Sequence, residues 1–335
     1  MGPLTYIITG AEGHLGTTLI RQLEDTGFPV VALTFAEPAE KSASPNVAYY
    51  HCDITKPETL EPIFKNVEGH LFCVIHCAAL IDIKSKKMTP RLEATNVQGT
   101  KNVFALYEKY GGTRFIYVST VDVFAHCHDN VTELKPLVDV NKAVGGYPIS
   151  KALATEFIKS KQAQGKDAII VYPGAAIGPY DDGHNAMVQL VRDYTLGKIP
   201  GVVKGGYALV DMRDVAKSIL TLCEGRHLGD SFILAGPAVP LKKILEIAKA
   251  WNRGKGKPIL VFPYCLAYLG LPFIALHAKA RHARPLYTSF ALGVIRHANT
   301  FSSEAAEKAF NFKPASAEEA IGATLDYLKV KGRIY

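Results

Sequence analysis

The chain has 335 residues, 48% of them apolar and 21% charged, which is ordinary for a globular protein of one large or two closely joined domains. The net charge of +7 is modest and looks scattered over small clusters such as residues 84–87 and 281–284. Such clusters are typical of solvated surfaces, and they argue against a nucleic-acid-binding protein.

Six cysteines are present and none forms a CxxC pair, which favours reduced thiols over a disulfide framework. Residues 126–128, His-Cys-His, lack the spacing and the second ligand pair of a zinc site, so we expect an ordinary polar loop and no metal. The first residues lead directly into an apolar, strand-like run, without the charged-then-apolar pattern of a leader. We therefore expect a cytoplasmic protein.

Short apolar runs alternate with helix-like segments through the first half of the chain. The predicted strands are residues 4–9, 29–34, 46–52, 71–77, 114–119 and 167–172, and the predicted helices are 17–27, 57–66, 90–110 and a segment that starts near residue 147. This alternation predicts βαβ units, and strands that are apolar along their whole length predict helices on both faces. We therefore expect an α/β fold with a doubly wound parallel sheet (Rossmann).

After residue 173 the pattern becomes shorter and mixed, which predicts a smaller C-terminal lobe laid over the carboxyl edge of the sheet. The expected division is a dinucleotide-binding domain at residues 1–175, with return segments around 205–235, and a mainly substrate-binding lobe at residues 176–335.

A glycine-rich loop follows the first predicted strand. Gly10, Gly13 and Gly16 allow a tight turn and a close approach of the backbone, and His14 and Leu15 lie beside the start of the next helix. A helix N-terminus offers free N–H groups and a positive dipole end to a pyrophosphate. The loop therefore predicts a dinucleotide site, with a merely structural turn as the alternative.

The kind of dinucleotide depends on the end of the second predicted strand. An acidic residue there would hold the ribose hydroxyls of NAD(H), but Thr34 and its neighbours include neither an acid nor an arginine. The missing acid favours NADP(H) over NAD(H) weakly. Asp53 and Ile54, at the end of the third predicted strand, are expected to meet the adenine, although Asp53 is equally suited to capping the next segment.

Tyr147 and Lys151 are spaced four residues apart, which places a phenol and an ammonium on one face of a helix. A neighbouring cation favours the phenolate, so it is expected to lower the pKa of the phenol toward working pH. Two other tyrosines, Tyr194 and Tyr327, also precede a lysine by four residues. Tyr147 is distinguished by its position: it lies in the first predicted helix after the strand that ends in Ser119 and Thr120, within the segment that begins with the glycine-rich loop.

Residues 259–276 contain no charge, but they are broken by Pro263, Gly270 and Pro272. A bilayer span needs about 20 apolar residues, so this run predicts a strand and a buried helix of the smaller lobe. Peripheral contact with a membrane through residues 259–284 is the alternative, because a basic stretch follows.

The motifs together resemble those of the extended short-chain dehydrogenases/reductases. They cover most of the first 175 residues: TGxxGxxG at 9–16, VIHCAA at 74–79, NVQGT at 96–100, YVST at 117–120 and YxxxK at 147–151. The 3β-hydroxysteroid dehydrogenase branch is similar in particular, on VIHCAALID at 74–82, STVDVF at 119–124 and AEKAFNFKP at 306–314.

The resemblance implies roles for individual residues. Tyr147 would be the catalytic acid/base, and Lys151 would bind the nicotinamide ribose. Thr120 would hold the reacting oxygen, with Ser119 as the alternative because neighbouring strand residues face opposite sides. Further residues are expected to contact the cofactor, namely Cys77, Ala78, Ala79, Asn96, Ser119 and Pro173. An arginine usually precedes that proline in the family, whereas Tyr172 stands here.

Substrate selection is expected from residues 80–88, 122–146 and 174–210, with Asp122 and Tyr180 among them. The resemblance and the hydroxyl–phenol pair imply an NAD(P)-dependent oxidoreductase that interconverts a secondary alcohol and a ketone. A 3-hydroxysteroid or a similarly bulky apolar hydroxy/keto compound is the expected substrate. A dihydroflavonol-reductase-like carbonyl reductase, a nucleotide-sugar epimerase or dehydratase, and a non-catalytic NADP-binding sensor are the alternatives. Analogy with the family also implies a homodimer.

Overall fold

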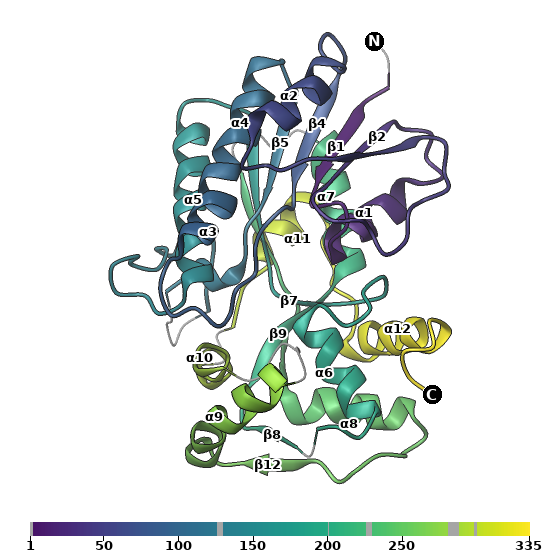
Figure 1. Cartoon of the computed structure of the whole chain (residues 1–335), viewed down its shortest axis with the longest axis vertical. Coiled ribbons are helices and arrows are strands. Elements are labelled where there is room, and N and C mark those ends of the chain that lie inside the picture. The colour runs from purple at the N-terminus through teal and green to yellow at the C-terminus, as the bar shows by residue number, and fades with distance from the viewer. Residues whose placement is uncertain (1–2, 126–129, 200, 226–229, 281–287, 298–299) are drawn as a thin grey trace.

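The computed structural model describes residues 3–125, 130–199, 201–225, 230–280, 288–297 and 300–335. Its centre is a sheet of seven parallel strands in the order β10-β6-β5-β4-β1-β2-β3 (Figure 1). The strands are β1 (Thr5–Thr9), β2 (Val30–Thr34), β3 (Val47–His51), β4 (Phe72–His76), β5 (Arg114–Val118), β6 (Ala168–Pro173) and β10 (Ser231–Leu234). The predicted doubly wound parallel sheet is confirmed.

Helices cover both faces of this sheet, which explains why its strands are apolar throughout. Side chains alternate between the faces, so Ile7 packs on one side while Tyr6 and Ile8 pack on the other. One face is covered by α2 (Pro57–Lys65), α4 (Gly99–Lys109) and α5 (Gly146–Ala163), and the other by α1 (His14–Leu23), α7 (Met212–Glu224) and α11 (Glu304–Phe310).

The helix expected at residues 90–110 is interrupted. It consists of α3 (Pro90–Leu92), a π-helical segment η1 (Glu93–Gln98) and α4. The π turn contains Asn96, which is buried. Such turns are often found at functional sites, because they redirect side chains.

The second lobe lies below the carboxyl edge of the sheet in Figure 1. It contains the small sheet β7 (Ala175–Ile177), β9 (Gly206–Asp211) and β11 (Ala238–Pro240), the pair β8 (Gly201–Val203) and β12 (Leu260–Phe262), and the helices α6 (Ala186–Thr195), α8 (Leu241–Trp251), α9 (Tyr264–Ala280), α10 (Ser289–His297) and α12 (Ala317–Val330). The chain alternates between the lobes, since α7, β10 and α11 pack with the large sheet although they follow β9.

The prediction for residues 259–276 is half right. A strand and a helix form, as β12 and α9, but α9 is not buried: Leu269 and Phe273 are 70% and 74% exposed. Among the described side chains of α9, those that pack on the lobe are Tyr264, Ala267 and Leu271. Within the described residues, no helix is both long and apolar enough to cross a membrane. Residues 281–284 of the proposed membrane contact and the loop 126–128 lie outside the described residues.

Candidate active site

The glycine-rich loop forms a cradle at the carboxyl end of β1. Gly10 has a φ of +66°, and a Cβ there would lie 2.8 Å from the Cα of Ala78. A Cβ on Gly16 would collide with the carbonyl oxygen of Gly10. Gly13 is exposed at the N-cap of α1, and no side chain caps the first turn of the helix. The loop therefore fits a pyrophosphate, which would accept hydrogen bonds from these backbone N–H groups.

His14 and Leu15 point their side chains away from this cradle. The His14 ring lies 2.9 Å from the carbonyl oxygen of Pro179 and 3.4 Å from the side-chain nitrogen of Asn185. Burial lowers the pKa of His14, so the ring is neutral and ties the glycine-rich loop to the second lobe. Leu15 packs in the core beside α7. Contact with a pyrophosphate would have to come from the backbone of both residues.

A carboxylate that the sequence analysis missed lies at the end of β2. Glu12 Oε1 accepts hydrogen bonds from the backbone N–H groups of Phe35 (3.0 Å) and Ala36 (3.3 Å), while its Oε2 is buried without a partner. Thr34, the position examined for an acid, is buried and donates to the Tyr50 carbonyl oxygen at 3.5 Å. The acid comes instead from the glycine-rich loop. Its position between Gly10 and Gly13 was the available signal, because β1 and β2 are adjacent strands.

The Asp53 carboxylate accepts hydrogen bonds from the backbone N–H and the hydroxyl of Thr55, at 2.9 and 2.7 Å. It therefore caps the turn before α2, which is the alternative that the sequence left open. The Ile54 carbonyl oxygen accepts from Asn102, and its side chain packs against Gly99. The contact of these two residues with adenine stays a prediction.

A chain of buried hydrogen bonds lies beneath the nucleotide loop. The Thr9 hydroxyl lies 2.7 Å from His76 Nδ1, and His76 Nε2 lies 3.0 Å from the hydroxyl of Thr100. Thr100 donates to the Asn96 carbonyl oxygen, and Thr9 accepts from the backbone N–H of Ala78. These directions assign a neutral His76 with its proton on Nε2, and burial lowers the pKa of His76 to about 3. The network fixes the chain where residues 77–79 leave β4.

Asn96 positions the start of the tyrosine helix. Its amide group pairs with the backbone of Leu80 at 2.7 and 3.0 Å, and it donates to the hydroxyl of Ser150 at 2.8 Å. Ser150 in turn donates to the Tyr147 carbonyl oxygen at 2.7 Å. The buried side chain of Asn96 thus positions Leu80 and Ser150 and is not exposed to the cavity. Cys77, between this network and Lys151, is a neutral thiol, because burial raises its pKa to about 12.

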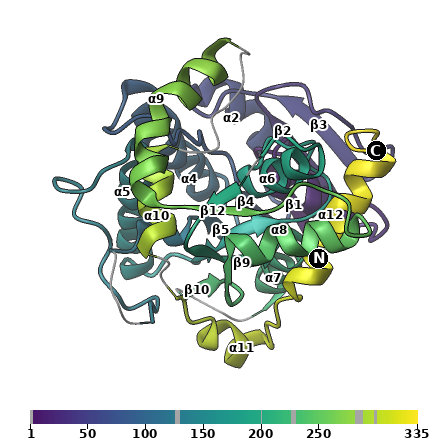
Figure 2. The ribbon, with the colours of Figure 1, turned by 90° about the horizontal axis from the view of Figure 1, so that it is seen from below.

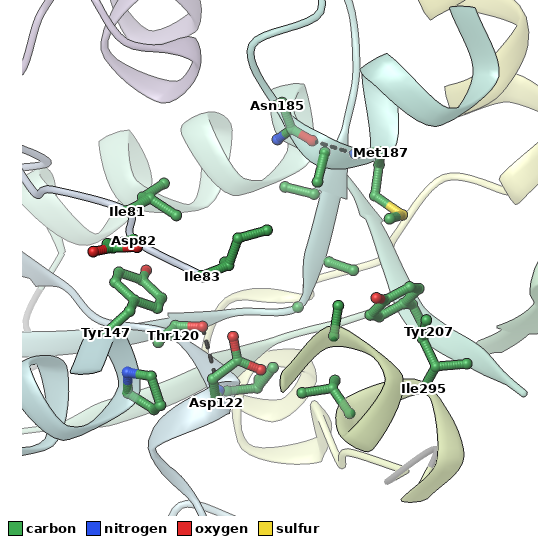
Figure 3. Close-up of a pocket in the computed structure, with 18 of the residues that line it drawn as sticks. Ile81, Asp82, Ile83, Thr120, Asp122, Tyr147, Asn185, Met187, Tyr207 and Ile295 are labelled. Atoms are coloured by element: carbon green, nitrogen blue, oxygen red, sulfur yellow. Dashed lines mark hydrogen bonds between the residues drawn. The ribbon is translucent and has the colours of Figure 1, made fainter. Parts of the chain in front are cut away.

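Tyr147, Thr120 and Asp122 face one another at the end of a cavity (Figure 3). The Thr120 hydroxyl accepts from the backbone N–H of Asp122 at 3.3 Å, and Thr120 lies beside Tyr147 (Figure 3). Ser119 points the other way: its hydroxyl is buried and lies 2.8 Å from that of Thr155. The structure therefore brings Thr120, and not Ser119, to the cavity.

The pKa of Tyr147 is raised, whereas the sequence analysis expected Lys151 to lower it. Burial and the charge of Asp122 raise the pKa of Tyr147 above its ordinary value, and the neighbouring Thr120 hydroxyl offsets part of this rise. Lys151 does not lower it, because its ammonium donates to the Val118 carbonyl oxygen and lies 4.4 Å from the centre of the Tyr117 ring. Burial lowers the pKa of Lys151 to about 7 and raises that of Asp122 to about 6.

The cavity has a volume of about 650 Å³ and runs from Tyr147 between the two lobes. Its far end is formed by the side chains of Met187, Tyr207 and Ile295 of the second lobe (Figure 3), and Leu241 and Val294 also line the cavity. Pro173 ends β6 directly before Gly174, which lines the cavity. The structure does not bring Tyr180 to this cavity. A left-handed backbone (φ 71°) follows Pro179, and the Tyr180 ring packs edge-on against Tyr327 of α12.

Comparison with known proteins gives a family match over most of the chain. The model of the NAD dependent epimerase/dehydratase family matches residues 6–233. A Synechocystis sp. protein, named provisionally as a dihydroflavonol 4-reductase, is 27% identical over 72% of this chain and 70% of its own. Sterol demethylase protein B of Methylococcus capsulatus is 24% identical over 78% of each.

A 3-beta-hydroxysteroid dehydrogenase of Mycolicibacterium neoaurum is 22% identical over 96% of this chain and 90% of its own. Among solved structures, the crystal structure of gox2253 is 24% identical, covers all of both chains and superposes with a TM-score of 0.78. At this identity the structural likeness supports the fold alone.

Proposed function

Because the chain belongs to the NAD dependent epimerase/dehydratase family, we propose that it is an oxidoreductase that interconverts a secondary alcohol and a ketone on a bulky apolar substrate. One observation carries this proposal: the phenol of Tyr147 and the hydroxyl of Thr120 meet at the end of a largely apolar cavity of about 650 Å³. Pockets of this size enclose most of a rigid, multi-ring molecule. We propose 3-hydroxysteroids and 3-ketosteroids as the first class to test.

The nicotinamide cofactor would supply or accept the hydride, and the residues of this chain handle the oxygen and its proton. In the reducing direction, Thr120 donates a hydrogen bond to the ketone oxygen, and Tyr147 transfers its phenolic proton to that oxygen as charge develops on it. In the oxidising direction, Tyr147 takes the proton back. Burial keeps Tyr147 protonated at neutral pH, which favours the reducing direction.

The apolar far end of the cavity supports an apolar substrate. A sugar nucleotide carries a diphosphate, which is usually bound by arginine, lysine or backbone N–H groups. Among the described residues that line the cavity, the lysine and arginine residues are Lys84 and Arg91, and both are exposed. Relatives named for sterols and 3β-hydroxysteroids support the same substrate class. The family name keeps an epimerase or dehydratase as the second candidate.

We further propose NAD(H) as the preferred cofactor, in place of the NADP(H) that the sequence favoured. Glu12 puts a carboxylate at the end of β2, where the ribose of the adenosine would lie. A carboxylate accepts hydrogen bonds from ribose hydroxyls and repels a 2′-phosphate. The nearby cations Lys41 and Arg21 are already paired, with Glu37 and with Glu24 and Glu40.

The test is a spectrophotometric screen of the purified protein against ketosteroids, hydroxysteroids, flavonoids and sugar nucleotides, with NADH or NADPH supplied separately. We expect nucleotide oxidation with ketosteroids or other apolar ketones, and faster turnover with NADH. Turnover of a sugar nucleotide without added nicotinamide would identify an epimerase instead. Nucleotide binding without turnover on any class would leave a binding protein.

A further inference from the structure

The surface formed by β12 and α9 exposes large apolar side chains almost without interruption. On α9, Leu266, Leu269, Phe273 and Leu276 are spaced by three, four and three residues, so they form a stripe on one side of the helix. Leu260 and Val261 of β12 are also exposed. Figure 2 shows both elements on the face turned toward the viewer. Contiguous apolar patches of this kind mark contact sites.

Most of the net positive charge falls in the sequence segment that contains β12 and α9, whereas the sequence analysis expected a scattered charge. Residues 247–303 contain eight lysines and arginines and no aspartate or glutamate, whereas the rest of the chain holds 30 basic and 31 acidic residues. Three of the eight, Arg253, Lys255 and Lys257, are exposed in the loop that leads into β12. The net charge of +7 therefore belongs to this segment.

From the apolar stripe and the exposed cations Arg253, Lys255 and Lys257 in the loop before β12, we propose that β12 and α9 dock on the surface of a membrane that contains anionic phospholipids. Apolar side chains would enter the boundary between headgroups and acyl chains, and the cations would pair with lipid phosphates. The proposal does not depend on the catalytic assignment.

A second copy of the chain is a less suitable occupant. In a two-fold dimer the same patch faces itself, so Arg253, Lys255 and Lys257 would approach their own copies, and residues 247–303 contain no aspartate or glutamate to pair with them. An anionic lipid surface supplies the missing opposite charge. The location also suits the proposed substrate, because α9 packs against α10, whose Ala291, Val294 and Ile295 line the cavity.

The experiment is co-sedimentation of the full-length protein with vesicles of phosphatidylcholine alone, or with about a third of the lipid replaced by phosphatidylglycerol. We expect binding to the anionic vesicles that weakens in about 0.5 M salt, and much weaker binding to the neutral ones. Leu269→Glu and Phe273→Glu should each weaken binding at least about tenfold. Lys255→Gln and Lys257→Gln should each weaken it about fivefold on anionic vesicles only.

Val330→Glu is the matched control, because Val330 is 85% exposed on α12, far from α9 in both ribbon views. It should bind vesicles as the unaltered protein does, and unchanged NADH binding should show that every variant is folded. Equal binding to both vesicle types, or an effect of Val330→Glu as large as that of Phe273→Glu, would overturn the proposal. So would light scattering that shows a dimer which Phe273→Glu dissociates, without any binding to vesicles.

Discussion

The ammonium of Lys151 lies 2.5 Å from the carbonyl oxygen of Val118, the last residue of β5. The contact holds the lysine beneath the end of the strand and against the face of Tyr117. Lys151 is only 3% exposed, and burial lowers its pKa to about 7. Burial of this ammonium therefore costs folding free energy, and the lysine lies next to the candidate active site.

Replacement of Lys151 by methionine should stabilise the cofactor-free protein. Between about pH 7 and 10 the unfolded chain holds a proton on this lysine that the folded chain has released, so the stability of the unaltered protein rises with pH. The advantage of Lys151→Met should be largest below about pH 7 and should shrink by about 1.4 kcal/mol per pH unit between about pH 7 and 10. Urea unfolding at several pH values measures this difference. Lys101→Met, an exposed lysine on α4, should show no such trend.

Tyr147→Phe should lower kcat by about 10²- to 10⁴-fold, because the variant cannot transfer a proton to the reacting oxygen. Binding of NADH, followed by fluorescence, should stay within a few-fold of the unaltered protein. Tyr327→Phe is the matched control, since Tyr327 also precedes a lysine by four residues but packs on Tyr180. Unchanged turnover in Tyr147→Phe would remove the catalytic assignment.

Thr120→Val and Ser119→Ala should separate two neighbouring hydroxyls. Thr120 faces the cavity and Tyr147, so its loss should reduce kcat about 10²-fold. Ser119 is hydrogen-bonded to Thr155 in the interior, so its loss should lower stability by about 1 kcal/mol and leave kcat nearly unchanged. Steady-state kinetics together with thermal unfolding would show the reverse pattern if Ser119 held the substrate oxygen.

Asp122→Asn should shift the pH dependence of alcohol oxidation. The pKa of Asp122 is about 6, so its carboxylate is ionised above that pH, and its charge raises the pKa of Tyr147. Without that charge the phenol ionises more easily, and the acidic limb of kcat/KM should move to lower pH by about one unit. Asp82→Asn, which lines the same cavity, serves as the control. An unshifted profile in Asp122→Asn would show that the two groups are not coupled.

Glu12→Gln should raise the affinity for NADPH relative to NADH about tenfold. The amide oxygen can still accept from Phe35 and Ala36, so the loop stays in place while the charge is lost. Fluorescence titration of each nucleotide needs no substrate, so the result is independent of the proposed reaction. Glu133→Gln is the matched control, because the Glu133 carboxylate also accepts a hydrogen bond from a backbone N–H, that of Ile233 at 2.7 Å. A parallel loss of both affinities in Glu12→Gln would reduce Glu12 to a loop anchor.

The sequence predicted the large sheet well because each of its first six strands is an apolar run bounded by turns or helices. The seventh strand, β10, was not predicted: it is only four residues long, and its pairing with β6 spans about 60 residues of chain. The helix α9 was expected to be buried from its composition alone. Burial depends on a partner surface, and among the α9 side chains that the structure describes, Leu266, Leu269, Phe273 and Leu276 are exposed.

At the site, local motifs predicted that the glycine-rich loop precedes a helix and that Tyr147 and Lys151 lie on one helix, as the structure has them in α1 and α5. The carboxylate of Glu12 was missed because the family pattern directed attention to Thr34 at the end of β2. Glu12 extends to that end of β2 from the glycine-rich loop after β1. The choice between Ser119 and Thr120 also required coordinates, since it depends on how the backbone turns after β5. The prediction that Lys151 lowers the pKa of Tyr147 was wrong, because helical spacing does not show where the ammonium of a lysine lies.

The repeated passage of the chain between the two lobes has a consequence for how the protein can be divided. Helix α7 packs on α1, and Phe310 of α11 packs on Phe232 of β10. The nucleotide-binding half therefore includes segments that come later in the sequence than much of the second lobe. A fragment that stops at residue 175 would leave β6 as a bare edge and α1 without its cover. The two lobes should therefore unfold in one cooperative transition, and neither should fold on its own.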